Sequence, residues 1–260
     1  MHELFEIDIN FWEFCIFVVV GILTGIINTL TGSGSLITLP VFVFICGLSP
    51  SMANGSNRVG VFMQSLVATS KFAKDKPDIF KDATWLIIPS VLGSIIGSKV
   101  AVDIDEKTMN YTLGGLMVFM LIILLFKPER WLIADKAEKA ENKNLKTFIT
   151  FFFIGIYGGF IQAGVGFFLL GGLVLISKYS LNQSNGLKLA LVLAFTAPAL
   201  ALFMYYGKVH YGYGLLMGIF QSFGAWIGVK YIMKIPNANI WIYRLLVLVV
   251  ALSALKFFIE

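Results

Sequence analysis

The stretch Gly21–Pro40 reads GILTGIINTLTGSGSLITLP, and its apolar run is interrupted by Gly32, Ser33 and Gly34. The interruption falls at about the depth where a membrane helix should be continuous, and irregular backbone at that depth is tolerated only inside protein or beside a cavity. The stretch Gly155–Gly172, GIYGGFIQAGVGFFLLGG, repeats the pattern: a GxxxG pair, an amide side chain three residues later and a Gly-x-Gly break. We expect the two breaks to meet near the middle of a bilayer and to form a binding site there.

The composition places the chain among polytopic membrane proteins. Of its 260 residues 58% are hydrophobic and only 13% are charged, whereas a soluble domain has roughly 25% charged residues. At roughly 20 apolar residues per crossing, the chain holds about eight to ten membrane segments and almost no extramembrane domain. The net charge of +5 comes from Lys and Arg in short loops, so it indicates a lipid bilayer as the partner and not nucleic acid.

The apolar segments form two sets of five on either side of a charged stretch. The second segment of each set is too short for a perpendicular span, so it is either half of a broken helix or one arm of a re-entrant hairpin. Residues recur at constant offsets between the sets, as in Asn54-Gly55 and Asn185-Gly186. We therefore predict an all-α fold of two inverted membrane repeats with broken or re-entrant helices, at 1–126 and 148–260, joined by a cytoplasmic linker at 127–147. The segments are expected at 11–30, 35–47, 53–73, 83–102, 109–126, 148–163, 167–178, 184–206, 211–232 and 239–259.

Charges in the loops predict the orientation. Positive residues favour the cytoplasmic side, and the linker 127–147 holds six of them. The N-terminal segment has acidic residues and no Lys or Arg, which places the N-terminus in the periplasm. The acidic residues of the N-terminal segment are Glu3, Glu6, Asp8 and Glu13.

An odd number of passes in each half inverts the second repeat relative to the first. Inverted repeats with discontinuous helices are typical of secondary transporters, whose substrate site lies at the repeat interface.

The apolar segments lack the groups that a metal site or an acid–base enzyme needs. The two histidines, His2 and His210, lie outside them, no Asp or Glu lies deep in any segment, and no HExxH, GxSxG or Walker A motif occurs. Cys15 and Cys46 lie within apolar segments, so no disulfide framework is expected. We therefore predict no enzyme, no metal site and no cofactor. Intramembrane carboxylates are also the usual proton relays and cation ligands, so a cation carrier is disfavoured.

The segments contain positive charge, amides and glycine breaks, which together suit an anion. Arg58 and Lys188 occupy corresponding places in the two halves; an ionisable residue inside a membrane segment indicates a functional site, and the alternative is that both snorkel to the interface. A half-helix that starts at a Gly-x-Gly break points backbone N–H groups into the gap, whereas glycines spaced GxxxG favour helix packing. We predict a substrate site made of Asn28, Gly32, Ser33, Gly34, Ser35, Asn57, Arg58, Gln162, Gly164, Gly166 and Lys188.

These features resemble the sulfite exporter TauE/SafE family. The resemblance rests on GILTGIINTLTGSGSLITLP, on SMANGSNRVG at 51–60, on the central basic linker and on the weaker repeat at 155–172, and it covers most of the chain. A richer glycine cluster is typical of the family where this chain has GSGS. The resemblance implies transport of small sulfur-containing anions such as sulfite, thiosulfate or organosulfonates across the bacterial inner membrane, by export.

Three functions are compatible with these residues. The first is a secondary transporter that moves a small anion by alternating access of the two repeats. The second is a transporter or a passive channel for another small anion, which would share the polar midplane. The third, a membrane enzyme or assembly factor, is opposed by the missing titratable groups. The coupling ion and the direction of transport are left open, and so is the formation of a homodimer.

Overall fold

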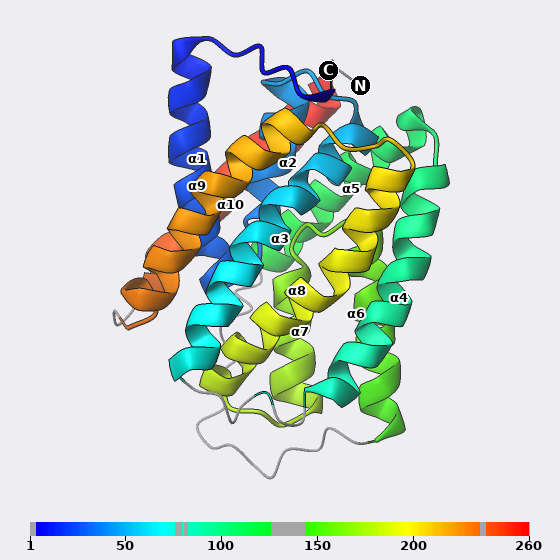
Figure 1. The fold of residues 1–260 in the computed structure, drawn as a ribbon, viewed down its shortest axis with the longest axis vertical. Coiled ribbons are helices and arrows are strands. Elements are labelled where there is room, and N and C mark those ends of the chain that lie inside the picture. The colour runs from blue at the N-terminus through cyan, green and yellow to red at the C-terminus, as the bar shows by residue number, and fades with distance from the viewer. Residues whose placement is uncertain (1–3, 76–79, 81–82, 126–143, 235–237, 260) are drawn as a thin grey trace.

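The computed structural model describes residues 4–75, 80, 83–125, 144–234 and 238–259, and every regular element in these ranges is helical. The described residues contain ten α-helices, which form one bundle in which segments of both halves lie side by side (Figure 1). The predicted all-α fold is therefore confirmed, and the linker predicted at 127–147 falls largely outside the described residues. The elements are α1 (Phe11–Leu30), α2 (Ser35–Phe44), α3 (Pro50–Asp75), α4 (Thr84–Asp103), α5 (Glu106–Leu125), α6 (Leu145–Phe160), α7 (Val165–Gly171) with the π turn η4 (Gly172–Ile176), α8 (Leu181–Tyr205), α9 (Tyr211–Lys230), the short turn η5 (Ile232–Lys234) and α10 (Ala238–Ile259).

Local caps set where two of the long helices begin. At the start of α1 the Asn10 side chain accepts a hydrogen bond from the Glu13 N–H (3.0 Å), and the Glu13 carboxylate accepts one from the Asn10 N–H (2.8 Å). Ser180 and Gln183 form the same reciprocal pair before α8. Such caps satisfy N–H groups that no helix carbonyl can reach. Five described helices, α1, α4, α5, α8 and α9, are long and apolar enough to cross a membrane, by length and composition.

The two short segments are the second arms of helical hairpins. After α1 and after α6 the chain reverses through a turn that contains a glycine with positive φ, Gly32 (72°) in the first turn and Gly164 (72°) in the second. Glycine adopts this left-handed conformation without the strain that a side chain would cause. The Gly-x-Gly breaks of the sequence are therefore the turns of the two hairpins.

Contacts along the arms show that both hairpins are antiparallel. Phe17, early in α1, packs edge-on against Phe42, late in α2, with 6.1 Å between ring centroids. Gly172, after α7, lies against Phe151 in the first half of α6. In Figure 1 the α1–α2 hairpin enters the bundle from the end at which α1 starts, and the α6–α7 hairpin enters from the opposite end. The two hairpins therefore approach each other tip to tip inside the bundle.

The first helix of each hairpin packs against a helix of the other half of the chain. α1 lies along α9, and α6 lies along α4. The backbones approach closely, because a Cβ at Gly25 would overlap the Gln221 carbonyl and a Cβ at Gly159 would overlap the Ser94 carbonyl. Small residues let membrane helices gain van der Waals contact where no hydrophobic force joins them. The predicted packing role is confirmed for the pairs Gly21/Gly25, Gly93/Gly97, Gly155/Gly159 and Gly224/Gly228.

Gly97→Leu should destabilise the contact between α4 and α6. A Cβ at Gly97 would overlap the backbone of Ile156 and Phe160, and extra atoms forced into a packed interface cost roughly 1–3 kcal/mol. We expect the apparent melting temperature in detergent, measured by size-exclusion chromatography after heating, to fall by about 5 °C or more. Gly115→Leu is the control, because nothing lies within 4 Å of a Cβ there. Equal melting temperatures for the two variants would contradict the packing role of Gly97.

Candidate functional site

The tips of the two hairpins touch. The Gly166 N–H at the start of α7 donates a hydrogen bond to the Gly32 carbonyl, at 3.1 Å. A Cβ on either glycine would overlap the backbone of the other, so the contact requires that both positions lack a side chain. The prediction that the two glycine breaks meet is confirmed.

Polar side chains around the first tip bind its backbone and one another. The Asn28 Oδ1 accepts a hydrogen bond from the Gly34 N–H at 2.6 Å. The sequence predicted that this amide at the start of α2 is unpaired, and that prediction is wrong. The Asn57 amide on α3 donates to the Ser35 hydroxyl at 3.0 Å, and its oxygen accepts from the Thr38 hydroxyl. Asn57 therefore holds α2 against α3.

At the second tip the backbone amide also has a partner. The Gln162 side chain donates to the Thr196 hydroxyl on α8, and Gly164 forms the turn. The N–H of Gly166 is used in the contact between the tips, and α7 has only seven residues before it continues as η4. At Gly166 the amide therefore joins the hairpins and is not the open N–H that the sequence predicted.

Arg58 on α3 is fully buried and binds the carbonyl end of α6. Its guanidinium donates to the carbonyls of Gly158 (3.1 Å), Gly159 (2.6 Å) and Phe160 (3.2 Å), and it lies 4.5 Å from the centroid of the Phe203 ring. A positive charge is favourable there because a helix C-terminus carries a partial negative charge. With 0% exposure, the side chain does not snorkel to the interface.

Lys188 on α8 has the equivalent contact with the other hairpin. Its ammonium donates to the carbonyls of Thr29 (3.0 Å) and Leu30 (2.9 Å) at the end of α1, and to the Asn185 side chain (3.3 Å). The side chain is 1% exposed. Snorkelling is therefore excluded for Lys188 as well. Both buried cations contact the C-terminal end of a hairpin helix inside the bundle: Arg58 contacts α6 and Lys188 contacts α1.

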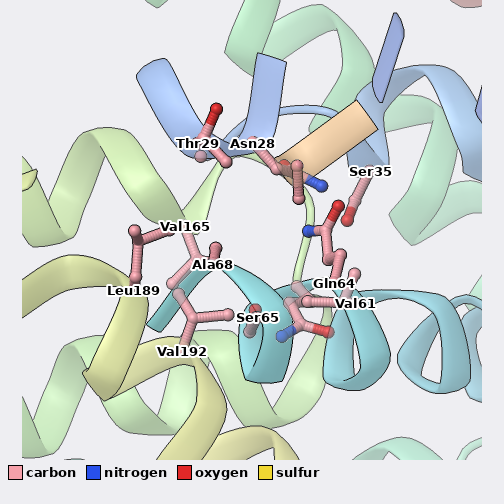
Figure 2. Close-up of a pocket in the computed structure, with 13 residues that line it drawn as sticks. Asn28, Thr29, Ser35, Val61, Gln64, Ser65, Ala68, Val165, Leu189 and Val192 are labelled. Carbon is pink, nitrogen blue, oxygen red and sulfur yellow. The ribbon is translucent and has the colours of Figure 1, made fainter. Parts of the chain in front are cut away.

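A small cavity lies beside the tips, and several helices contribute amide, hydroxyl and apolar side chains to its wall (Figure 2). Its volume is about 20 Å³, enough for a water molecule. Three buried amide atoms of its wall, Asn28 Nδ2, Gln64 Oε1 and Gln162 Oε1, have no hydrogen-bond partner among the described residues. The wall consists of Asn28, Thr29, Gly32, Ser35, Val61, Gln64, Ser65, Ala68, Gln162, Val165, Leu189, Val192 and Ala225.

Four of the eleven residues predicted for the substrate site lie in this wall. They are Asn28, Gly32, Ser35 and Gln162. The remaining seven lie outside the wall, and their part in substrate binding stays a prediction. They are Ser33, whose hydroxyl pairs with that of Thr31 at 2.6 Å, and Gly34, Asn57, Arg58, Gly164, Gly166 and Lys188.

The part of the wall that comes from α3 is missing from the predicted site. Val61, Gln64 and Ala68 follow Asn57 by four, seven and eleven positions, which is the spacing of one helix face. That periodicity is the signal that assigns Gln64 to the same face as Asn57. The residues from α8 and α9 carry no comparable local signal, because only packing brings these helices to the cavity.

The cavity offers hydrogen bonds from amides and hydroxyls and no charged side chain. Its wall contains no Asp, Glu, His, Lys or Arg. In the described part of the chain, no group of three His, Cys, Asp or Glu side chains is placed to hold a metal ion. The wall can therefore exchange a few hydrogen bonds with a bound molecule, and it holds no acidic or basic side chain.

The fold is that of a polytopic membrane protein, because five described helices are long and apolar enough to cross a membrane and two helical hairpins meet inside the bundle. The chain belongs to the sulfite exporter TauE/SafE family, whose sequence profile matches residues 17–257. The resemblance seen in the sequence is confirmed.

Curated relatives carry transporter names as well. A probable membrane transporter protein of a Sinorhizobium species is 24% identical over 226 residues, which cover 87% of this chain and 85% of the relative. One from Haemophilus influenzae is 27% identical over 229 residues, covering 87% and 88%. The probable membrane transporter protein YfcA of Escherichia coli K12 is 24% identical over 216 residues, covering 83% and 79%. No solved structure matches the chain.

Proposed function

We propose that this protein is a secondary transporter that moves a small anion by alternating access. The observation that carries the proposal is the meeting of two opposed hairpins at Gly32 and Gly166, beside a cavity whose wall includes three unpaired amide atoms of described residues. Discontinuous helices that meet inside the bundle form the substrate site of many secondary transporters. The proposed substrates are sulfite, thiosulfate or an organosulfonate, moved outward, and the name of the family supports this choice.

The charges around the tips support an anion. Each tip pairs one cation, Arg58 or Lys188, with a helix C-terminus that carries about −0.5 charge, so about half a positive charge remains at each tip. No carboxylate lines the cavity. An anion beside the tips would be attracted by this field and would accept hydrogen bonds from donors such as the Asn28 Nδ2, which has no partner among the described residues.

The size of the cavity supports a carrier over a passive channel. A volume of about 20 Å³ holds a water molecule, whereas an oxyanion of four or five heavy atoms needs more room. The walls must therefore separate before the anion enters. The α1–α2 and α6–α7 hairpins meet there, so a rocking motion of one half against the other would open the site to each side in turn.

The packing of the two halves supports inverted repeats. α1 lies along α9 and α6 lies along α4, so each hairpin occupies the corresponding place in the opposite half. The hairpins enter from opposite ends of the bundle in Figure 1, as a twofold axis in the membrane plane would place them.

Charges at the helix ends support the proposed orientation in a bacterial inner membrane. Asp103 ends α4 and Glu106 begins α5, at the end of the bundle where α1 starts. Lys71 and Lys74 lie in the last turns of α3, at the opposite end. Because positive residues favour the cytoplasm, the N-terminus is assigned to the periplasm and the linker 127–147 to the cytoplasm.

Purified protein in proteoliposomes should catalyse counterflow of a sulfur oxyanion. In vesicles preloaded with unlabelled thiosulfate, labelled thiosulfate should accumulate transiently above the level in protein-free vesicles, because a carrier exchanges its bound substrate. Sulfite and an alkanesulfonate should compete, and sodium should not. Anion flux without counterflow would identify a channel. Counterflow of a carboxylate but of no sulfur anion would overturn the substrate class, and no flux of any anion would overturn the transport proposal.

A further inference from the structure

Each half of the chain supplies a buried cation that holds the hairpin of the other half. Arg58 lies on α3 in the first half and binds the last carbonyls of α6 in the second half. Lys188 lies on α8 in the second half and binds the carbonyls of Thr29 and Leu30 at the end of α1. The two contacts therefore cross between the halves.

An asparagine one turn before each cation takes part in the same contact. Asn54 donates its amide to the Phe160 carbonyl at 2.8 Å and accepts from Arg58 at 3.4 Å. Asn185 accepts from the Lys188 ammonium at 3.3 Å. The same pair of residue types thus recurs in both halves, and in each case it lies at a helix end that stops inside the bundle.

Helices that end inside an apolar bundle need such caps. The last four carbonyls of a helix have no partner within the helix, and no water reaches them in the hydrocarbon core. A cation supplies several donors together with a charge opposite to that of the helix C-terminus. Within the described residues neither Arg58 nor Lys188 has a carboxylate within ion-pair distance, so the carbonyls are their principal partners.

Both cations, Arg58 and Lys188, lie outside the wall of the closed cavity, and their donors bind helix carbonyls. The Arg58 Nε has no acceptor among the described residues, but the guanidinium lies over the Phe203 ring, and Phe203 is outside the wall as well. We propose that Arg58 and Lys188 are positioning residues: each fixes the hairpin of the opposite half so that the tips meet, and neither is a ligand of the transported anion.

This inference deepens the proposed transport function and has a readout that does not depend on it. Hydrogen–deuterium exchange in detergent reports whether the last turn of each hairpin helix stays formed. Arg58→Met should raise exchange in peptides covering 155–161, and Lys188→Met should raise it in peptides covering 26–32, each by at least about tenfold. Each loosened helix end thus lies in the half that does not carry the substitution. Lys99→Met is the control, because Lys99 is a half-exposed lysine near the end of α4, and it should change neither peptide.

Transport kinetics supply the second readout. In both methionine variants the maximal rate of counterflow should fall at least about tenfold while KM stays within about twofold, because the hairpins are displaced and the anion ligands are unchanged. Arg58→Lys and Lys188→Arg keep a cation that donates to the same carbonyls, so they should restore exchange and rate to near wild-type values. If the methionine variants fail to fold, Arg58→Lys and Lys188→Arg decide between the two roles. A ligand role predicts a raised KM in these variants, whereas a positioning role predicts a KM near the wild-type value.

Two results would overturn the proposal. One is a raised KM with unchanged exchange at both helix ends, which would make the cations ligands of the anion. The other is loosening confined to the half that carries the substitution, which would remove the crossed contact. If wild-type protein moves no anion at all, the transport proposal fails, and the exchange pattern still tests the caps.

Discussion

Gly166→Ala should lower the rate of transport by about 100-fold, although it adds only one methyl group. The new Cβ would overlap the Gly32 Cα and the Thr31 carbonyl oxygen, which are backbone atoms that cannot rotate away. The hairpin tips must therefore separate, and the hydrogen bond from the Gly166 N–H to the Gly32 carbonyl is lost. Overpacking of this kind costs about 1–3 kcal/mol, and the upper value corresponds to about 150-fold in an equilibrium constant.

Counterflow in proteoliposomes, normalised to the amount of reconstituted protein, measures this effect. Gly171→Ala is the matched control, because it makes the same change at the end of α7, where nothing lies within 4 Å of the added Cβ. We expect Gly171→Ala to transport like the wild type and both variants to insert normally. Equal rates for Gly166→Ala and Gly171→Ala would show that the transport cycle does not require the contact between the tips.

Asn28→Asp should abolish anion transport at neutral pH, chiefly because it adds a negative charge. Asn28 lines the cavity, and a carboxylate of nearly the same shape keeps the acceptor that binds the Gly34 N–H. The substitution removes the Nδ2 donor and places a negative charge beside the anion. Two like charges 4 Å apart repel by about 4 kcal/mol at an effective dielectric constant of about 20, which weakens binding by about 10³-fold.

Asn10→Asp is the control for this charge effect, because it makes the same substitution at the exposed start of the same helix. Asp caps a helix about as well as Asn, so Asn10→Asp should transport like the wild type. Protonation neutralises the new carboxyl at position 28, so transport by Asn28→Asp should recover as the pH is lowered. Wild-type rate and KM for Asn28→Asp at neutral pH would mean that the anion does not pass this cavity.

The helical segments and their breaks could be predicted from the sequence because they depend on local properties. The predicted segment 11–30 coincides with α1, and the predicted short segment 35–47 contains α2. Gly32 and Gly164 adopt positive φ, a conformation that glycine permits at any place in a chain. The choice between a broken helix and a re-entrant hairpin could not be made locally, because it depends on where the second arm packs.

The roles of the polar residues were harder to predict. Arg58 and Lys188 stand out in the sequence as cations in apolar segments, which favours a substrate ligand or a snorkelling side chain. Their observed partners are carbonyls 100 positions away for Arg58 and 159 positions away for Lys188. In the same way, the Gly34 amide looks open in the sequence, whereas the Asn28 side chain binds it in the fold.

By itself the sequence determined the class of the protein, the places where its helices stop, and the lack of acidic groups in its apolar segments. These properties follow from composition, from hydrophobic runs of membrane length and from the backbone freedom of glycine. Only the tertiary structure decided that the α1–α2 and α6–α7 hairpins touch at Gly32 and Gly166, and that each buried cation caps the hairpin of the other half. The reason is physical: a helix end inside a membrane protein must find donors for its carbonyls, and in this fold the packing of α3 and α8 brings them from the opposite half of the chain.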